Sequence, residues 1–140
     1  MQTLVPLERT LTELDHTRLT HLLRGNGASP QEAGIAALSA ALDAADIVPS
    51  RAVAPDVVTM YSRAELEDPG TGRRQVLTVC YPEDAEPAAG FVSVLSPVGA
   101  GLLGLRVGMQ AQWHTPGGRA AQAQVRALLF QPEASGDFTL

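Results

Sequence analysis

The first 50 residues carry apolar side chains at the spacing of an amphipathic helix. Thr12 is a suitable N-cap for a first helix, and the glycine-rich stretch after Arg24 permits the left-handed turn that ends many helices. The apolar side of this helix is formed by Leu14, Leu19, Leu22 and Leu23.

A second helix is predicted to begin at a capping box. Ser29 is the N-cap, Pro30 takes the first helical position, and Glu32 follows three residues after the cap. Its apolar side is formed by Ile35, Leu38 and Leu42. Two helices joined by a short loop run antiparallel, so residues 1–50 are predicted to form an N-terminal helical hairpin.

Beyond Asp46 the apolar period changes from helical to alternating, which is typical of strands. Strands are predicted at residues 57–61, 75–81, 91–94, 109–114 and 120–131. Turn-forming residues separate several of them, and one short helix is predicted to begin after Ser96, with Pro97 at its first position. The chain is therefore predicted to be α+β, with residues 51–140 forming an antiparallel β domain with one short helix.

Composition narrows the possible functions. The hydrophobic fraction of 45% is enough for a packed core, and no segment approaches the ~20 apolar residues of a membrane span. The net charge is −5 and the ten basic residues, all Arg, are scattered, which disfavours a protein that binds nucleic acid on its own. Cys80 is the single cysteine and no signal peptide is evident, so we expect a cytoplasmic protein.

Two patterns could indicate a ligand site. Residues 99–104 match G-x-G-x-x-G, but dinucleotide binding also needs a parallel βαβ unit and an acid about 20 residues further on. Neither is predicted, so these glycines are interpreted as small residues of a tightly packed helix. The three histidines, His16, His21 and His114, have no neighbouring Cys or carboxylate cluster. We therefore predict no catalytic residue, no metal site and no cofactor.

Four segments carry a resemblance to a known family: residues 55–63, residues 96–108, Trp113 with residues 115–118, and residues 130–137. In this order and spacing they resemble the regulator of nucleoside diphosphate kinase family, small bacterial relatives of the Gre transcript-cleavage factors. The Ser96-Pro97 segment and the Thr-Pro-Gly-Gly turn are also similar to Gre factors. The resemblance covers nearly all of residues 51–140 and, more weakly, the helical hairpin.

The resemblance implies an FK506-binding-protein-like C-terminal domain and an N-terminal antiparallel coiled coil. In Gre factors the C-terminal domain docks at the rim of the RNA polymerase secondary channel. Ser96 and Pro97 match the Gre docking loop, and Leu95 stands where Gre-type proteins can have Asp. The resemblance therefore makes Leu95, Ser96 and Pro97 the candidate polymerase-binding residues.

In Gre factors, acidic residues at the coiled-coil tip help to hold a catalytic magnesium ion. The corresponding loop here offers Arg24, Asn26, Ser29 and Glu32. Glu32 is the only acid among them, and its predicted place in the capping box explains it without a metal-binding role. Each arm, at about 13–17 residues, spans only about 20–25 Å, far short of a Gre arm.

The function predicted from the sequence is a non-catalytic, monomeric regulator of transcription elongation that binds RNA polymerase. The resemblance also links this protein to regulation of nucleoside diphosphate kinase. An association with DNA is implied only by the family. No membrane partner and no sequence-specific nucleic-acid binding are expected. The alternative is a prolyl isomerase or peptide-binding module of the FK506-binding-protein type.

Overall fold

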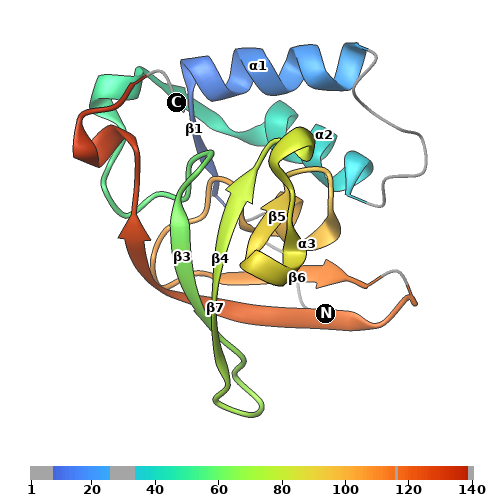
Figure 1. The fold of residues 1–140 in the computed structure, drawn as a ribbon. Helices are drawn as coiled ribbons and strands as arrows, with labels where there is room; N and C mark the ends of the chain where they lie inside the picture. The colour runs from blue at the N-terminus through green and yellow to red at the C-terminus, as the bar shows by residue number, and fades with distance from the viewer. Residues whose placement is uncertain (1–7, 26–33, 116, 139–140) are drawn as a thin grey trace, which may run out of the picture.

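The computed structural model describes residues 8–25, 34–115 and 117–138. Two helices, α1 (Glu13–Arg24) and α2 (Ile35–Ala44), lie along one side of a curled sheet (Figure 1). They are flanked by two three-residue strands, β1 (Thr10–Thr12) and β2 (Asp46–Val48), which pair in parallel. The two predicted helices are confirmed, whereas nothing in the helical pattern indicates this small sheet.

Five strands form the main sheet, in the spatial order β5-β4-β3-β7-β6. Their bounds are β3 (Arg63–Glu67), β4 (Arg74–Cys80), β5 (Phe91–Ser93), β6 (Gln110–His114) and β7 (Ala120–Phe130). β4 and β5 pair in parallel, and the other three pairings are antiparallel. The α+β class and an antiparallel-rich sheet are therefore confirmed.

Short helices complete the chain. The α3 helix (Pro97–Leu102) packs against β5 and β6 on the inner side of the curl (Figure 1). Ser96 caps it and Pro97 stands in its first turn, as predicted. Among the described residues, 3-10 helices lie between the strands at η1 (Ser50–Ala52), η2 (Pro82–Asp84) and η3 (Pro87–Ala89), and η4 (Glu133–Ser135) follows β7.

The ends of the two long helices follow local capping rules only in part. Thr12 caps α1, because its Oγ1 accepts a hydrogen bond from the Asp15 N–H at 3.0 Å. Gly25 ends α1 with φ −88°, so the left-handed conformation is not used at this residue. The capping box predicted at residues 29–32 lies outside the described residues. The described α2 begins after Gly34, whose N–H donates to the Leu95 carbonyl at 2.8 Å.

The strand predicted at residues 57–61 is wrong. Val57 forms one isolated bridge with Arg106, and the chain then turns. Tyr61 has φ +66°, a left-handed conformation that is incompatible with a strand and costly for an aromatic residue. Val57, Val58 and Met60 are nearly completely buried, so the apolar pattern reported burial correctly but not the backbone conformation.

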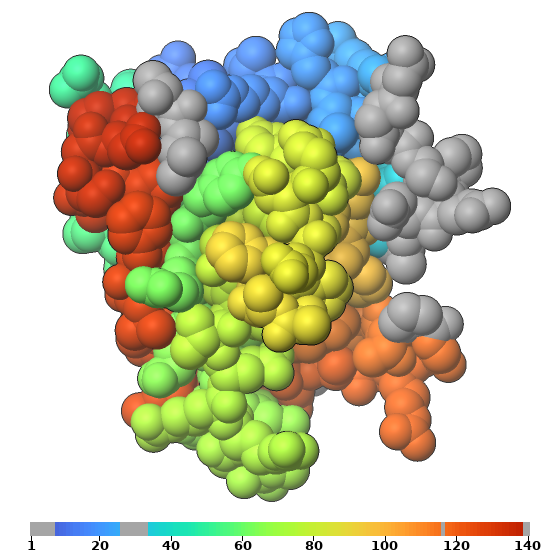
Figure 2. All heavy atoms as spheres, in the orientation of Figure 1, coloured from blue at the N-terminus to red at the C-terminus, as the bar shows by residue number. Residues whose placement is uncertain are grey.

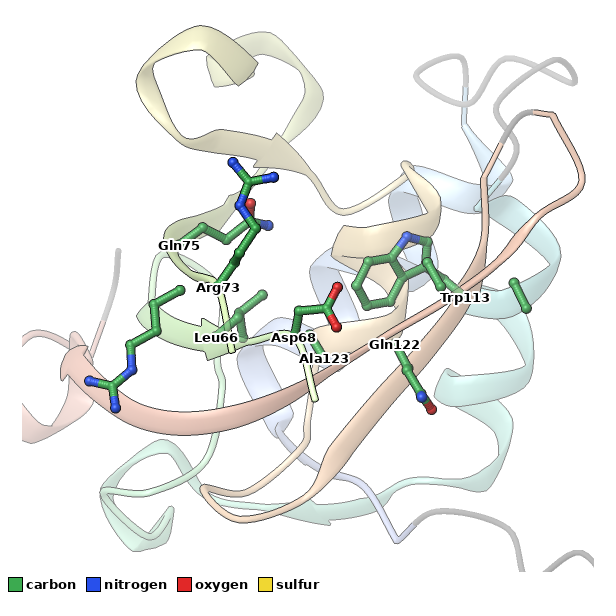
Figure 3. Close-up of a pocket in the computed structure, with 10 residues that line it drawn as sticks. Leu66, Asp68, Arg73, Gln75, Trp113, Gln122 and Ala123 are labelled. Atoms are coloured by element: carbon green, nitrogen blue, oxygen red, sulfur yellow. The ribbon is translucent and has the colours of Figure 1, made fainter. Parts of the chain in front are cut away.

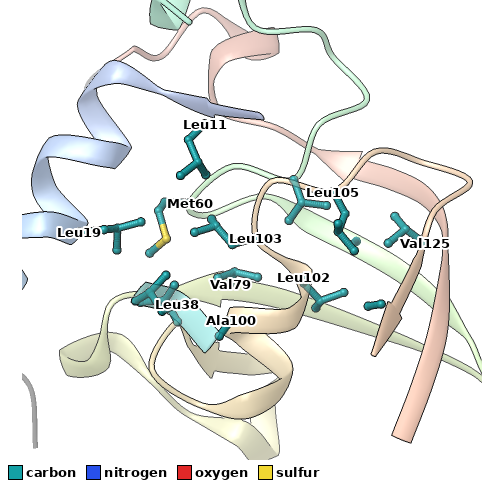
Figure 4. Close-up of a cluster of buried hydrophobic side chains, with 14 of the residues drawn as sticks. Leu11, Leu19, Leu38, Met60, Val79, Ala100, Leu102, Leu103, Leu105 and Val125 are labelled. Carbon is teal, nitrogen blue, oxygen red and sulfur yellow. The ribbon is translucent and has the colours of Figure 1, made fainter. Parts of the chain in front are cut away.

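One hydrophobic core joins the N-terminal helices to the sheet (Figure 4). Leu19 of α1 and Leu38 of α2 are fully buried in the same cluster as Met60 and Val79. The α3 helix and the segment after it contribute Ala100, Leu102, Leu103 and Leu105. The division into units 1–50 and 51–140 stays a prediction, and these leucines show that both segments contribute to one core.

The N-terminal segment is also attached to the far end of α3. Arg9 donates from Nη1 to the carbonyl oxygens of Ala100 at 2.9 Å and Leu103 at 2.7 Å. A cation is favourable there because the last carbonyls of a helix lack partners within the helix. Thr10 N–H donates to the carbonyl of Gly104 at 3.0 Å. These bonds position β1, and therefore the start of α1, on the C-terminal part of the chain.

The glycines of the 99–104 motif serve close packing, as interpreted from the sequence. A Cβ atom on Gly99 would lie 2.1 Å from the Ser93 carbonyl oxygen, far inside van der Waals contact. Gly104 adopts φ +83°, which side chains rarely tolerate. The motif therefore lets α3 lie directly on the backbone that precedes it.

We expect Gly99→Ala to destabilise the protein by about 3 kcal/mol or more, because backbone rather than a flexible side chain must move to admit the methyl group. Urea unfolding followed by circular dichroism measures this change. Gly117→Ala is the matched control, since the nearest atom to its added Cβ is Thr115 Oγ1 at 4.0 Å. Equal unfolding midpoints for the two variants would contradict the packing role of Gly99.

Candidate functional site

The loop that leads into α3 contains the three predicted docking residues. Ser96 is partly buried, and its Oγ accepts from the Gly99 N–H at 3.2 Å while donating to the Ser93 carbonyl at 2.6 Å. Pro97 is also partly exposed, whereas Leu95 is fully buried in the core. A partner that reaches this loop therefore meets Ser96 and Pro97, and Leu95 anchors the loop from beneath.

The start of α2 lies directly against this loop. Besides the hydrogen bond from Gly34 to Leu95, a Cβ atom on Gly34 would come within 2.4 Å of the carbonyl oxygens of both Leu95 and Ser96. Backbone therefore touches backbone at this point. The structure thus brings the predicted docking loop next to Gly34, after which the described α2 begins.

The predicted hairpin tip is only partly described. Arg24 is exposed at the end of α1, and Asn26, Ser29 and Glu32 lie outside the described residues. At 1.5 Å per residue, the 12 residues of α1 and the 10 of α2 span about 18 and 15 Å. His16 Nε2 lies 3.1 Å from the Leu42 carbonyl oxygen, so this histidine joins the two helices.

A groove lies on the inner face of the sheet, beyond α3 (Figure 3). Its volume is about 560 Å³. It separates the β3–β4 turn from the β6–β7 end, which project as two lobes in Figure 2. Its lining includes an apolar part of Leu66, Trp113 and Ala123 and polar side chains of Asp68, Arg73 and Gln75.

Sequence reasoning missed this groove, because its walls come from strands distant in the chain. A lone tryptophan in a strand indicates ordinary packing, and Trp113 does pack on α3, because its Cβ would lie 3.6 Å from a Cβ on Gly101. Trp113 also lines the groove. Alternation along β6 and β7 places Trp113 and Ala123 on the same face, which is the only sequence signal for the site.

A buried polar cluster lies where α1 meets the 59–62 turn. The Asp15 carboxylate is 1% exposed, and its Oδ2 accepts from the Met60 N–H at 3.1 Å. Burial, aided by the nearby Glu133, raises the pKa of Asp15 to about 6, although hydrogen bonds to Met60 and Thr12 and the charge of Arg18 act against the shift. This carboxyl group titrates far closer to neutrality than an ordinary aspartate.

The described residues offer little that is suited to catalysis. They contain no group of three or more His, Cys, Asp or Glu side chains placed to hold a metal ion. Cys80 is buried in β4, and burial raises the pKa of its thiol to about 11, which disfavours the nucleophilic thiolate. No helix in the described ranges is long and apolar enough to cross a membrane.

Comparison with known proteins places this geometry in a family. Residues 53–128 match the C-terminal family of transcription elongation factors GreA/GreB. The chain is 40% identical over 133 residues to a regulator of nucleoside diphosphate kinase from Escherichia coli strain K12, which covers 93% of this chain and 95% of that protein.

Two further relatives are less similar in sequence. The transcription inhibitor protein Gfh1 of Thermus aquaticus is 37% identical over 91 residues, covering 60% of this chain and 58% of Gfh1. A solved GreA/GreB elongation factor structure from Nitrosomonas europaea superposes with a TM-score of 0.71 at 30% identity, covering 89% of this chain and all of that one. The chain therefore belongs to the regulator of nucleoside diphosphate kinase family, which is related to the GreA/GreB transcription elongation factors.

Proposed function

We propose that this protein is a non-catalytic regulator of transcription elongation that binds RNA polymerase at the rim of its secondary channel. The match of residues 53–128 to the C-terminal GreA/GreB family carries the proposal. The names of two relatives, a transcription elongation factor and a transcription inhibitor protein, support a role in transcription. We further propose that it acts as a cytoplasmic monomer and that it affects nucleoside diphosphate kinase, as the name of the Escherichia coli relative states for that protein.

The proposed contact is the loop formed by Ser96 and Pro97. Ser96 Oγ is engaged in two hydrogen bonds within the loop, so its main role is to fix the loop conformation. The Pro97 ring and the surrounding backbone then supply the contact surface. Two finer features belong to the same proposal: an FK506-binding-protein-like C-terminal domain around α3, and a short coiled coil formed by α1 and α2.

We expect Pro97→Ala to weaken polymerase binding at least severalfold, because it removes the exposed ring while alanine still suits the first turn of α3. Ser96→Asp places a charge in the same loop and is expected to act in the same direction. Competition with a labelled wild-type chain for core RNA polymerase measures both.

Pro87→Ala is the matched control, since Pro87 is an exposed proline in the first turn of η3, away from the loop. Thermal unfolding shows whether each variant is folded. A folded Pro97→Ala or Ser96→Asp variant that competes as well as wild type would show that the docking surface lies elsewhere.

We also expect no stimulation of transcript cleavage. A Gre-type mechanism must bring carboxylate oxygens to a metal ion deep in the channel. The loop between the helices holds one acid, Glu32, together with Arg24 at its start, and the described helices are short. In backtracked elongation complexes, added protein should leave cleavage at the intrinsic rate, and Glu32→Gln should behave like wild type.

Two results of the cleavage assay would distinguish competition with a Gre factor from stimulation of cleavage. Suppression of cleavage stimulated by a Gre factor would support competition for one docking site. Cleavage above the intrinsic rate, lost on Glu32→Gln, would contradict the non-catalytic assignment.

A peptide-binding module is the second candidate, and the groove beside Trp113 is the observation that favours it. Prolyl isomerase activity has weaker support, because Trp113 is the one aromatic side chain in the described lining of that groove. Trp113 is the only tryptophan of the chain, so tryptophan fluorescence reports on this one position in the groove lining. Under the main proposal, an Ala-Ala-Pro-Phe peptide leaves the emission unchanged, and a saturable blue shift would favour peptide binding instead.

A further inference from the structure

Asp15 is the only buried carboxyl group in the described part of the chain. It stands in the first turn of α1, three residues after the N-cap Thr12. A residue there commonly turns its side chain back to the cap. The Asp15 carboxylate interacts with the Thr12 side chain in this way and also accepts the Met60 N–H, 45 residues away in sequence. The bond therefore joins α1 to the C-terminal part of the molecule.

The 59–62 turn is a fixed partner for this carboxylate. Thr59 Oγ1 donates to Glu133 Oε1 in η4 at 2.7 Å, and the Tyr61 N–H donates to the Val79 carbonyl in β4 at 2.6 Å. The turn is closed by the Ser62 N–H, which donates to the Thr59 carbonyl at 3.0 Å. Met60 is 1% exposed, so its N–H depends on Asp15 rather than on water.

Charged and titratable groups reach Asp15 from three elements. Arg18 comes from α1 itself and favours the ionised carboxylate, whereas Glu133 of η4 opposes it. Tyr81, just after β4, interacts with both Asp15 and Arg18. Burial opposes ionisation more than any of these groups, because a charged carboxylate loses its hydration there.

We propose that the buried Asp15 carboxyl group, where α1 meets the 59–62 turn, is a proton-operated latch. Its neutral form suits the buried position and holds α1 closed. Its ionised form lets α1 open more readily, because the cost of burying the charge exceeds what the Met60 hydrogen bond returns. The closed latch keeps the carboxyl group out of water, and opening α1 returns it to water. The proposal does not depend on polymerase binding, because it concerns only contacts within this chain.

The direction of the pH dependence follows from proton linkage. The carboxyl pKa is about 6 in the closed state and near its usual 3.8 once exposed, so the closed state binds more protons between these values. The additional free energy that favours the closed state is fully present below pH 3.8 and is lost as the pH rises through about 6. A difference of about two pKa units corresponds to at most about a 100-fold change in the opening equilibrium.

The test uses nuclear magnetic resonance on the full chain. The Met60 amide should titrate with a midpoint near 6, because its hydrogen-bond acceptor gains charge there. Hydrogen exchange of α1 amides, corrected for intrinsic rates, should show an opening constant that rises between tenfold and about 100-fold from pH 4 to pH 8. A Met60 amide that does not titrate over this range overturns the proposal.

Three variants isolate the carboxyl group. Asp15→Asn keeps an acceptor for Met60 without the charge, so α1 exchange should lose its pH dependence. Glu13→Gln, an exposed acid in the same turn, should leave that dependence as in wild type. Glu133→Gln should lower the Met60 midpoint by removing a repulsive charge. An unchanged pH profile in Asp15→Asn contradicts the latch, and if that variant does not fold, the wild-type Met60 titration decides.

Discussion

The need to satisfy buried backbone groups in the 59–62 turn determines how the rest of the molecule fits together. The turn lies in the core and belongs to no strand, so the N–H groups that it does not satisfy internally, those of Met60 and Tyr61, must find partners in other elements. They find Asp15 in α1 and the Val79 carbonyl in β4, while Thr59 binds Glu133 beyond β7. One short turn therefore sets the positions of the first helix, the centre of the sheet and the C-terminal segment.

Close backbone contacts give the proposed docking loop its position. Gly99 lets α3 rest on the Ser93 carbonyl, and Gly34 lets α2 rest on Leu95 and Ser96. The loop at Ser96 and Pro97 is thus held from both sides without long side chains. This arrangement suits a contact surface that must keep one shape, and it places the start of α2, at the tip end of the predicted hairpin, beside the surface that is proposed to meet RNA polymerase.

Local signals predicted the elements whose conformation local chemistry decides. The Thr12 cap, the Ser96-Pro97 start of α3 and the four strands after residue 70 all follow from side chains close in sequence. The 57–61 segment was mistaken for a strand because a buried turn and a buried strand share the same apolar pattern. The Asp15–Met60 hydrogen bond has no signal in the sequence, because the two residues are 45 positions apart and only the fold brings them together. The groove beside Trp113 was missed for the same reason, and the docking and tip residues stay predictions.

Binding of the full chain to core RNA polymerase tests the central claim most directly. The informative measurement is a titration of labelled chain with purified core enzyme, followed by displacement with an unlabelled Gre factor. The account predicts a saturable one-to-one complex from which the Gre factor displaces the chain. Absence of saturable binding, or a complex that persists unchanged under excess Gre factor, would contradict a shared site at the secondary channel.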